Sequence, residues 1–190
     1  MNHFRNPYRS ARIMMMLTLV LAPSSLQAMK VIKRGDSIGV FYVTKITGAE
    51  SDGVKPGQRL CYRCRFGTRP MVMLFARQVD ERLDALVRHL DRLVAEHQES
   101  KIKGLVTLIG EDQETLEREA LGLLKRSGAK EIPLAVATEQ GVRANQYQLP
   151  EEADVTIVIA RDSRVLQTLI FDLDKIDFSL LDKELERLLK

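Results

Sequence analysis

Short apolar runs that alternate with helical patterns constrain this chain more than any other feature of its sequence. Three such runs lie at 71–76, 104–109 and 132–137. An unbroken apolar run of this length is typical of a strand that is buried on both faces of a sheet. Between the first two, apolar residues recur at helical spacing over 79–94, which predicts an amphipathic helix. A second helix is expected to begin near Asp112 and to end at Gly128. The alternation predicts an α/β domain.

The two ends of this alternating region have their own patterns. Apolar segments at 155–160 and 165–171 flank the sequence Arg-Asp-Ser-Arg, which predicts a β-hairpin. The last residues carry Phe178, Leu181, Leu185 and Leu188 on one helical face. Upstream, 37–46 is rich in β-branched and aromatic residues, which predicts a strand, and 48–57 is rich in turn residues, which predicts a connection. We expect these upstream residues to form an N-terminal β extension along one edge of the sheet.

This order of elements resembles the thioredoxin fold, and it is most similar to the peroxiredoxin and secreted-thioredoxin branch. The most specific likeness is the segment 153–171, in which a strand, a tight turn and a partner strand follow one another. The resemblance implies a three-layer α/β sandwich over 71–190, with 29–70 as the N-terminal β extension and its CxxC loop. It also implies a redox centre at 79–82 and a cis-proline at position 154. The sequence has no cysteine at the first of these and Asp154 at the second.

The first 28 residues have the pattern of an export signal. Arg5, Arg9 and Arg12 precede an apolar run at 13–22, and a polar break follows that ends at Ala28. An apolar run of about ten residues is too short for a bilayer, which needs about 20. We therefore expect cleavage after Ala28 and a periplasmic or secreted protein without a permanent membrane anchor. A retained signal-anchor is the alternative.

The net positive charge of the chain comes from this leader. The sequence has 29 Lys and Arg against 26 Asp and Glu, and three of the arginines but none of the acids lie before residue 29. The remainder therefore carries 26 residues of each sign. A nucleic-acid-binding domain would need a net basic charge or a long basic face. No nucleic-acid partner is expected.

Cys61 and Cys64 are the two cysteines of the chain, and they form a CxxC motif. Their surroundings are basic, since no acidic residue lies between Gly53 and Val79. Positive charge near a thiol favours the thiolate, which makes the corresponding disulfide more oxidising. The predicted thiolate-stabilising residues are Arg59, Arg63, Arg65 and Arg69. Either cysteine could be the attacking thiol, with the other as the resolving one.

Three interpretations of the pair remain open at the level of sequence. Cys61 and Cys64 could exchange disulfides with a protein thiol partner, or they could form an inert local bond. A disulfide between residues only three positions apart removes little chain entropy from the unfolded state, which weakens the interpretation of the bond as a stabilising one. A metal site is less well supported, because structural zinc takes four ligands and the sequence has no second CxxC. Covalent haem is excluded, because Arg65 stands where that motif requires histidine. We expect no metal and no cofactor.

The sequence therefore supports two hypotheses of different classes. In the first, the chain is a secreted or periplasmic thioredoxin-like protein that exchanges disulfides through Cys61 and Cys64. In the second, it is a non-catalytic binding or scaffold module of the same fold, in which the bond only holds the loop. A peroxidase ranks below both, because it would need a cysteine at 79–82.

Overall fold

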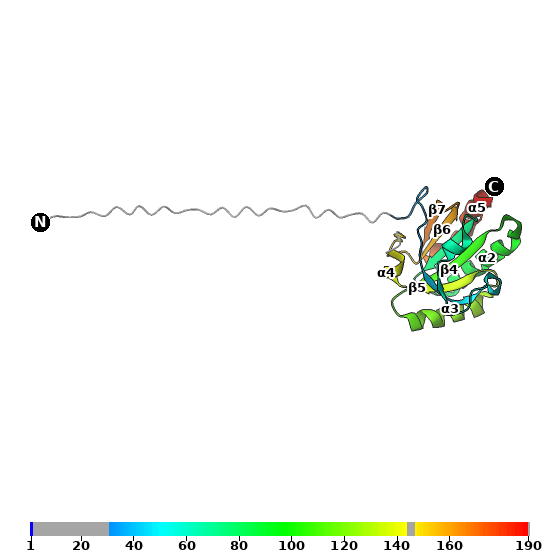
Figure 1. Ribbon diagram of the computed structural model, residues 1–190, viewed down its shortest axis with the longest axis horizontal. Helices are drawn as coiled ribbons and strands as arrows, with labels where there is room; N and C mark the ends of the chain where they lie inside the picture. Colours follow the sequence, from blue (N-terminus) through cyan, green and yellow to red (C-terminus); the bar gives the residue numbers. More distant parts are fainter. Residues whose placement is uncertain (2–30, 144–146, 190) are drawn as a thin grey trace.

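The computed structural model describes Met1 and residues 31–143 and 147–189 (Figure 1). The export signal predicted at 1–28 lies outside these residues, apart from Met1. The strands are β1 (Val43–Gly48), β2 (Arg59–Leu60), β3 (Met71–Ala76), β4 (Lys103–Ile109), β5 (Pro133–Ala137), β6 (Val155–Arg161) and β7 (Arg164–Phe171). The helices are α1 (Tyr62–Phe66), α2 (Glu81–Glu96), α3 (Gln113–Ser127), α4 (Glu139–Arg143) and α5 (Phe178–Leu189). Three short 3-10 helices are η1 (Glu50–Asp52), η2 (Gln98–Ser100) and η3 (Leu173–Lys175).

The strands form one mixed sheet in the order β2-β1-β5-β4-β3-β6-β7. The central strands β3, β4 and β5 are parallel, and β6 and β7 continue the sheet beyond β3 in antiparallel orientation. On the other side, β1 pairs with β5 and β2 pairs with β1, both antiparallel. This topology confirms the predicted α/β fold of thioredoxin type with an N-terminal β extension.

Two apolar layers lie on the two faces of the sheet. Helices α2, α3 and α5 cover one face, where Leu86, Leu123 and Leu185 are among the buried residues. The other face is covered by α1, by α4 and by the chain on either side of them, with Phe41 and Tyr147 at its centre. Each central strand contributes alternate side chains to both layers. The result is the predicted three-layer arrangement, because every central strand is buried on both sides.

The two long helices begin and end where local chemistry favours it. The Asp80 side chain caps α2 by accepting hydrogen bonds from the N–H groups of Arg82 and Leu83. Asp112 caps α3 in the same way through the N–H of Thr115. The hydrogen bond from the Thr115 hydroxyl, followed by that from its N–H, lowers the pKa of the Asp112 carboxyl. Gly128 ends α3 with a φ of 70°, a left-handed conformation that glycine adopts at little cost. The helix end predicted at Gly128 is confirmed.

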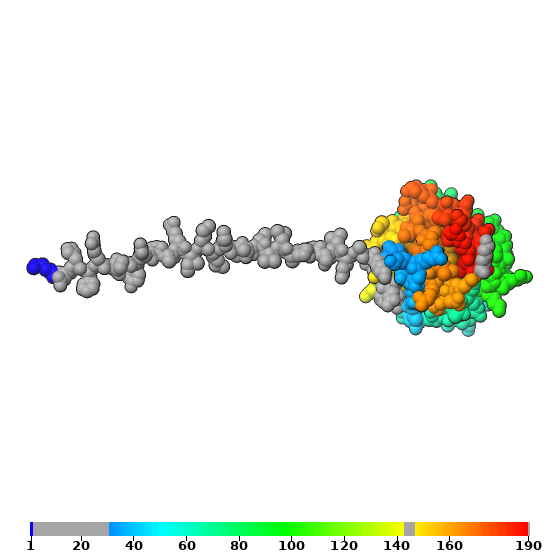
Figure 2. Space-filling view, turned by 90° about the horizontal axis from the view of Figure 1, so that it is seen from above, coloured from blue at the N-terminus to red at the C-terminus, as the bar shows by residue number. Residues whose placement is uncertain are grey.

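The hairpin between β6 and β7 is also confirmed. Its two turn residues, Asp162 and Ser163, have φ values of 53° and 63°, as expected for the tight turns that join twisted strands. The strand predicted at 37–46 is only partly right, because β1 begins at Val43. Ser37 instead forms an isolated bridge with Arg164. Figure 2 shows this N-terminal segment, in blue, lying against the orange strands of the hairpin.

Candidate functional site

The CxxC motif lies at the start of helix α1, directly after β2. Cys61 is the N-cap residue of α1, and its Sγ accepts a hydrogen bond of 3.1 Å from the backbone N–H of Cys64. The two sulfurs form a disulfide with a Cα–Cα distance of 5.3 Å. A helical turn brings residues three apart onto one side, so the short helix sets the two cysteines in bonding range. The sequence patterns did not predict this helix.

The two cysteines differ in exposure. Cys61 is 8% exposed, whereas Cys64 is an exposed residue. A thiol from another protein therefore has better access to Cys64. This difference distinguishes the two sulfurs, which the sequence alone could not do.

Helix α1 is fixed to the body of the protein by its aromatic side chains. Tyr62 and Phe66 are buried, and their ring centroids lie 5.5 Å apart. Both side chains point into the layer that also contains Met71 and Val54. The face of α1 that carries Cys64 is therefore the outer one.

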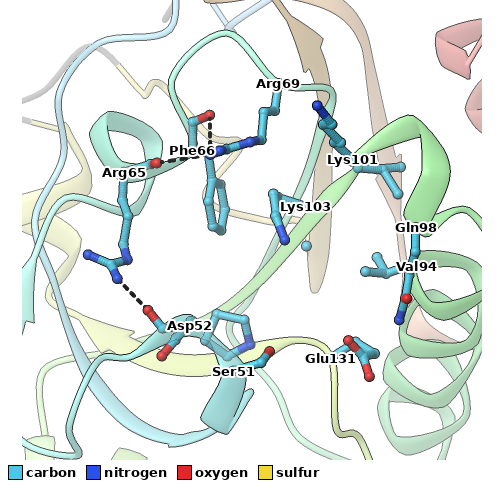
Figure 3. A pocket seen from close by; sticks show the side chains of 13 residues that line it. Ser51, Asp52, Arg65, Phe66, Arg69, Val94, Gln98, Lys101, Lys103 and Glu131 are labelled. Atoms are coloured by element: carbon cyan, nitrogen blue, oxygen red, sulfur yellow. Dashed lines mark hydrogen bonds between the residues drawn. The ribbon is translucent and has the colours of Figure 1, made fainter.

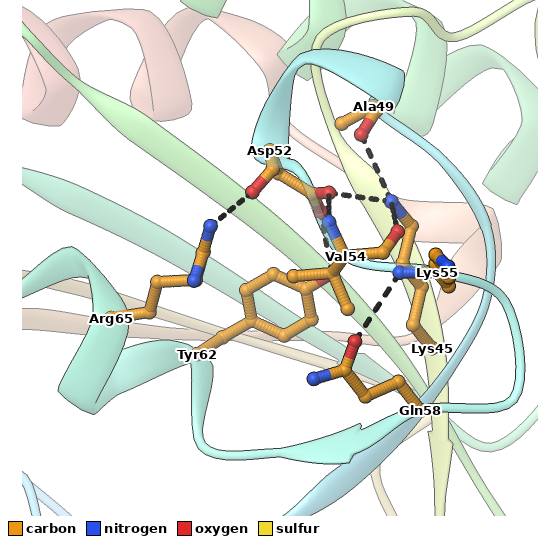
Figure 4. A network of polar contacts seen from close by, with 8 residues as sticks. All are labelled: Lys45, Ala49, Asp52, Val54, Lys55, Gln58, Tyr62 and Arg65. Carbon is orange, nitrogen blue, oxygen red and sulfur yellow. Dashed lines mark hydrogen bonds and ion pairs between the residues drawn. The ribbon is translucent and has the colours of Figure 1, made fainter.

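A polar network lies beneath α1 and centres on Asp52 (Figure 4). The Tyr62 hydroxyl donates a hydrogen bond of 2.6 Å to Asp52 Oδ2, and Lys45 Nζ lies 2.7 Å from Asp52 Oδ1. The Lys45 ammonium also donates to the carbonyl groups of Ala49 and Val54, at 2.9 and 3.0 Å. Lys45 is 1% exposed, so these acceptors take the place of water around its charge.

The network also changes the chemistry of Tyr62. Burial of the phenol, followed in importance by its hydrogen bond to Asp52, raises the pKa of Tyr62 well above its ordinary value. The hydroxyl therefore stays protonated and continues to donate to Asp52 over the physiological pH range. Lys45, Asp52 and Tyr62 together connect the CxxC helix to strand β1.

The four arginines predicted to stabilise a thiolate make contacts of their own. The Arg65 guanidinium donates to the carbonyl oxygen of Asp52. Arg69 donates to the carbonyl oxygens of Phe66 and Arg65, at 3.3 and 3.5 Å, near the end of α1. Within the described residues, neither of these side chains donates a hydrogen bond to a cysteine sulfur.

Arg59 and Arg63 have different surroundings. The Arg59 guanidinium carbon lies 5.4 Å from the centre of the Tyr42 ring, a cation–π contact. Arg63 stands between the two cysteines, and its Nε is buried without a hydrogen-bond partner among the described residues. The charge of Arg63 also acts on Tyr147, where it opposes the rise in pKa that burial causes. Of these four arginines, Arg63 is the one whose side chain forms no hydrogen bond, ion pair or ring contact with a described residue.

The opposite pole of the sheet is where the resemblance places the redox centre, after β3. Arg77 there forms an ion pair of 2.6 Å with Glu139 and donates to the carbonyl oxygen of Pro150 at 2.7 Å. Asp154, at the position of the family's proline, accepts a hydrogen bond from the N–H of Leu173. No cis peptide bond occurs among the described residues. These residues hold loops together, and the cysteine pair lies at the other end of β3.

Two further properties concern the described residues as a whole. Among residues 31–143 and 147–189, no three His, Cys, Asp or Glu side chains gather as they would around a metal ion. No helix in these ranges is long and apolar enough to cross a membrane.

Comparison with known proteins gives matches in structure alone. No protein-family model and no curated protein matches the chain by sequence. A thiol:disulfide interchange protein of the thioredoxin family from Chlorobium tepidum TLS superposes with a TM-score of 0.60 and 11% identity, over 83% of this chain and 98% of that one. A secreted Mycobacterium tuberculosis disulfide oxidoreductase, homologous to E. coli DsbE, has a TM-score of 0.58 and 11% identity, over 77% and 95%. Peroxidoxin BcpB from the same species has a TM-score of 0.58 and 19% identity, over 83% and 96%.

These likenesses confirm the thioredoxin-like fold. At identities this low, they do not carry function or individual residues from those proteins to this one.

Proposed function

We propose that this protein exchanges disulfides with a protein thiol partner through Cys61 and Cys64, in the oxidising compartment to which its leader directs it. The observation that carries the proposal is the pairing of an exposed Cys64 with a Cys61 whose sulfur already accepts a backbone N–H. Exchange needs one sulfur that a partner can reach and one that leaves readily as a thiolate. A hydrogen bond to sulfur favours the charged form and so improves the leaving group.

The steps follow from this geometry. A thiolate of the partner attacks Cys64 Sγ, the bond between Cys61 and Cys64 breaks, and its electron pair passes to Cys61 as a thiolate. A mixed disulfide now joins Cys64 to the partner. A second thiolate of the partner then attacks the partner's own sulfur in that bond and releases Cys64 as a thiolate. The partner gains a disulfide, the pair gains two electrons, and the reverse sequence reduces a partner disulfide.

Positive charge near the pair supports the same proposal. In the sequence, Arg63 lies between the cysteines, with its Nε unpaired among the described residues, and Arg59, Arg65 and Arg69 lie within five positions of one of them. Guanidinium groups close to sulfur stabilise the reduced pair relative to the disulfide. Removing them should make the bond harder to reduce.

The alternative is a structural bond in a binding module. The burial of Cys61 and the anchoring of Tyr62 beneath it favour this alternative, because they hold the helix in place. The reduction potential separates the two functions. Equilibration with glutathione redox buffers, followed by alkylation and mass measurement, gives this potential. A value above about −250 mV fits an exchanger, and one below about −300 mV fits a structural bond.

Single substitutions test the assigned order of attack. In Cys61→Ser, the exposed Cys64 should form a stable mixed disulfide with a partner peptide, because no resolving thiol remains. In Cys64→Ser, the shielded Cys61 should form it much more slowly. Circular dichroism of both variants checks that the fold is kept. Equal rates of mixed-disulfide formation in the two variants would contradict the assignment of Cys64 as the attacked sulfur.

A further inference from the structure

A cationic groove adjoins the CxxC helix (Figure 3). It has a volume of about 670 Å³ and lies between α1 and the segment that joins α2 to β4. Arg65 and Arg69 line it from α1 and the loop that follows, and Lys101 and Lys103 line it from the start of β4 and the residues before it. All four residues are exposed. Its volume is in the range of sites that bind ligands, about 300–1,000 Å³.

The charge of the groove is not cancelled by its own acids. Two carboxylates, those of Asp52 and Glu131, line it. The Asp52 carboxylate is already engaged by Lys45, Tyr62 and the N–H of Val54. Lys101 and Lys103, in contrast, make no side-chain hydrogen bond or ion pair with a described residue. The chain beyond residue 28 has equal numbers of acids and bases, so this excess is a local property.

The position of the groove connects it to the disulfide. Arg65 directly follows Cys64 in α1, so the groove begins one residue from the exposed cysteine. An extended peptide spans about 3.3 Å per residue. Residues a few positions from a thiol bound at Cys64 would therefore reach the lysines. The four cations are spread over two segments of the protein, which suits a chain with several carboxylates better than a compact anion.

We infer that this groove binds an acidic segment next to the reactive cysteine of the partner protein. The inference rests on the proposed function for the role of the bound partner, and the binding itself can be measured without it. Opposite charges at such a surface increase the association rate and select among partners. The protein would then exchange disulfides preferentially with cysteines that have acidic neighbours.

Binding is tested with peptides that contain no cysteine. A fluorescent peptide of alternating Glu and Ser is titrated with the full chain beyond Ala28, and a Lys–Ser peptide of equal length serves as its counterpart. The acidic peptide should bind, and the variant Lys101→Glu/Lys103→Glu should bind it at least about tenfold more weakly. The matched control Lys33→Glu/Lys183→Glu makes the same charge change at exposed lysines outside the groove and should bind like the parent.

The possible results lead to different conclusions. Equal weakening in both double variants, or no binding at all, overturns the inference. Displacement of the peptide by inorganic phosphate at a similar concentration also overturns it, in favour of a small-anion site. Binding should persist in Cys61→Ser/Cys64→Ser, because the groove does not need the sulfurs. If the acidic peptide binds but the protein does not exchange disulfides, the proposed function fails and the groove assignment stands.

A second measurement joins the groove to the chemistry. Two peptides with the same cysteine pair, one flanked by Glu and one by Lys, are oxidised by the disulfide form of the protein. The acidic peptide should react faster, and the Lys101→Glu/Lys103→Glu variant should reverse this preference. Equal rates for both peptides would contradict a role of the groove in partner choice while leaving exchange through Cys61 and Cys64 intact.

Discussion

The hydroxyl of Tyr62 donates a hydrogen bond of 2.6 Å to Asp52 Oδ2, which joins the residue that directly follows Cys61 to the segment that follows β1. The same carboxylate binds Lys45, so a contact made by the CxxC helix continues into the sheet. The position of the disulfide therefore depends on residues that lie nine to sixteen positions before Cys61.

Replacement of Tyr62 by Phe should loosen this connection. The variant Tyr62→Phe keeps the ring and removes the donor, which leaves the part-buried Asp52 oxygen without its partner. The free energy of unfolding should fall by about 1–3 kcal/mol in urea denaturation. Hydrogen exchange at the Cys64 amide should become faster. The exposed Tyr42 is the matched control, and Tyr42→Phe should change neither quantity. A Tyr62→Phe variant with the stability of the parent would contradict the assigned role of the hydroxyl.

Loss of the buried cation should be more damaging. In Lys45→Met, the Asp52 carboxylate loses its counter-ion inside the protein, which costs about 3–5 kcal/mol when one partner of a buried pair is removed. Urea denaturation measures the effect. Asp52→Asn in the same chain should restore part of the loss, since the uncompensated charge is then absent. Lys175→Met is the control at an exposed pair and should leave the stability unchanged. Additive losses in the Lys45 and Asp52 double variant would show that the two residues act independently.

Replacement of Arg63 by Gln should make the disulfide harder to reduce. Arg63 lies between the two cysteines in the sequence and its side chain forms no hydrogen bond or ion pair with a described residue, so we expect the loss of its charge to destabilise the thiolates of the reduced pair. A shift of about 30 mV toward more negative potential corresponds to a tenfold change in the exchange equilibrium. Arg82→Gln, at the opposite pole, should leave the potential unchanged. A potential that stays the same in Arg63→Gln would exclude this arginine as a thiolate-stabilising residue.

Tyr147 should make the protein sensitive to alkali. Burial raises the pKa of Tyr147 above its ordinary value of 10.0, and its hydroxyl donates to the carbonyl oxygen of Gly39. Below pH 10 the phenol is protonated in both the folded and the unfolded chain, so its contribution to stability is complete. Above about pH 10 only the unfolded chain loses the proton, so stability falls by up to about 1.4 kcal/mol per pH unit.

The variant Tyr147→Phe isolates this contribution. Above pH 10, the free energy of unfolding should fall less steeply with pH, by up to about 1.4 kcal/mol per pH unit, because one fewer group releases a proton on unfolding. At pH 7 the variant should also be less stable than the parent, because a hydrogen bond is lost. Denaturant titrations between pH 8 and pH 11 give the slope. Tyr42→Phe makes the same substitution at an exposed tyrosine and is the matched control. An unchanged slope in Tyr147→Phe would show that another group titrates in this range.

Gly48 should tolerate no side chain, because it is the last residue of β1 and pairs closely with Pro133 at the start of β5. Its φ is 79°, and a Cβ built there would lie 2.3 Å from the carbonyl oxygen of Ile132. Gly48→Ala should therefore lose more than the roughly 1–3 kcal/mol of an unfavourable backbone conformation. Gly57→Ala is the matched variant, since Gly57 has a φ of 80° with no atom near its Cβ position. Equal losses of unfolding free energy at the two glycines would show that the close approach to Ile132 contributes nothing.

The fold could be predicted because its central elements repeat simple patterns. The apolar runs at 71–76 and 104–109 are long enough to identify buried strands, and each coincides with an observed strand or part of one. Helix α1 could not be found in the same way, since five residues are too few to display a helical period. Its sequence instead resembles a basic loop around the CxxC motif.

The surroundings of the site depend on contacts between distant residues. Asp52 and Tyr62 are ten positions apart and belong to no recognisable motif, and Arg77 and Glu139 are 62 positions apart. Pairs of this kind are set by how the elements pack, which local patterns do not record. The sequence did indicate the basic character of the segment after Gly53. It could not indicate that Arg65 and Arg69 share a groove with Lys101 and Lys103, at and just before the start of β4, because only the folded chain brings these residues together.

The small ring closed by the disulfide has a consequence for the reduced form of the protein. Cys61 and Cys64 are three positions apart, within the first turn of α1. Opening their bond therefore frees no strand and lengthens no connection of the sheet, which is held by its own ladders and by the contacts of Tyr62. We therefore expect the scaffold to be the same whether the sulfurs are joined or apart, so that the proposed exchange would need no refolding between cycles.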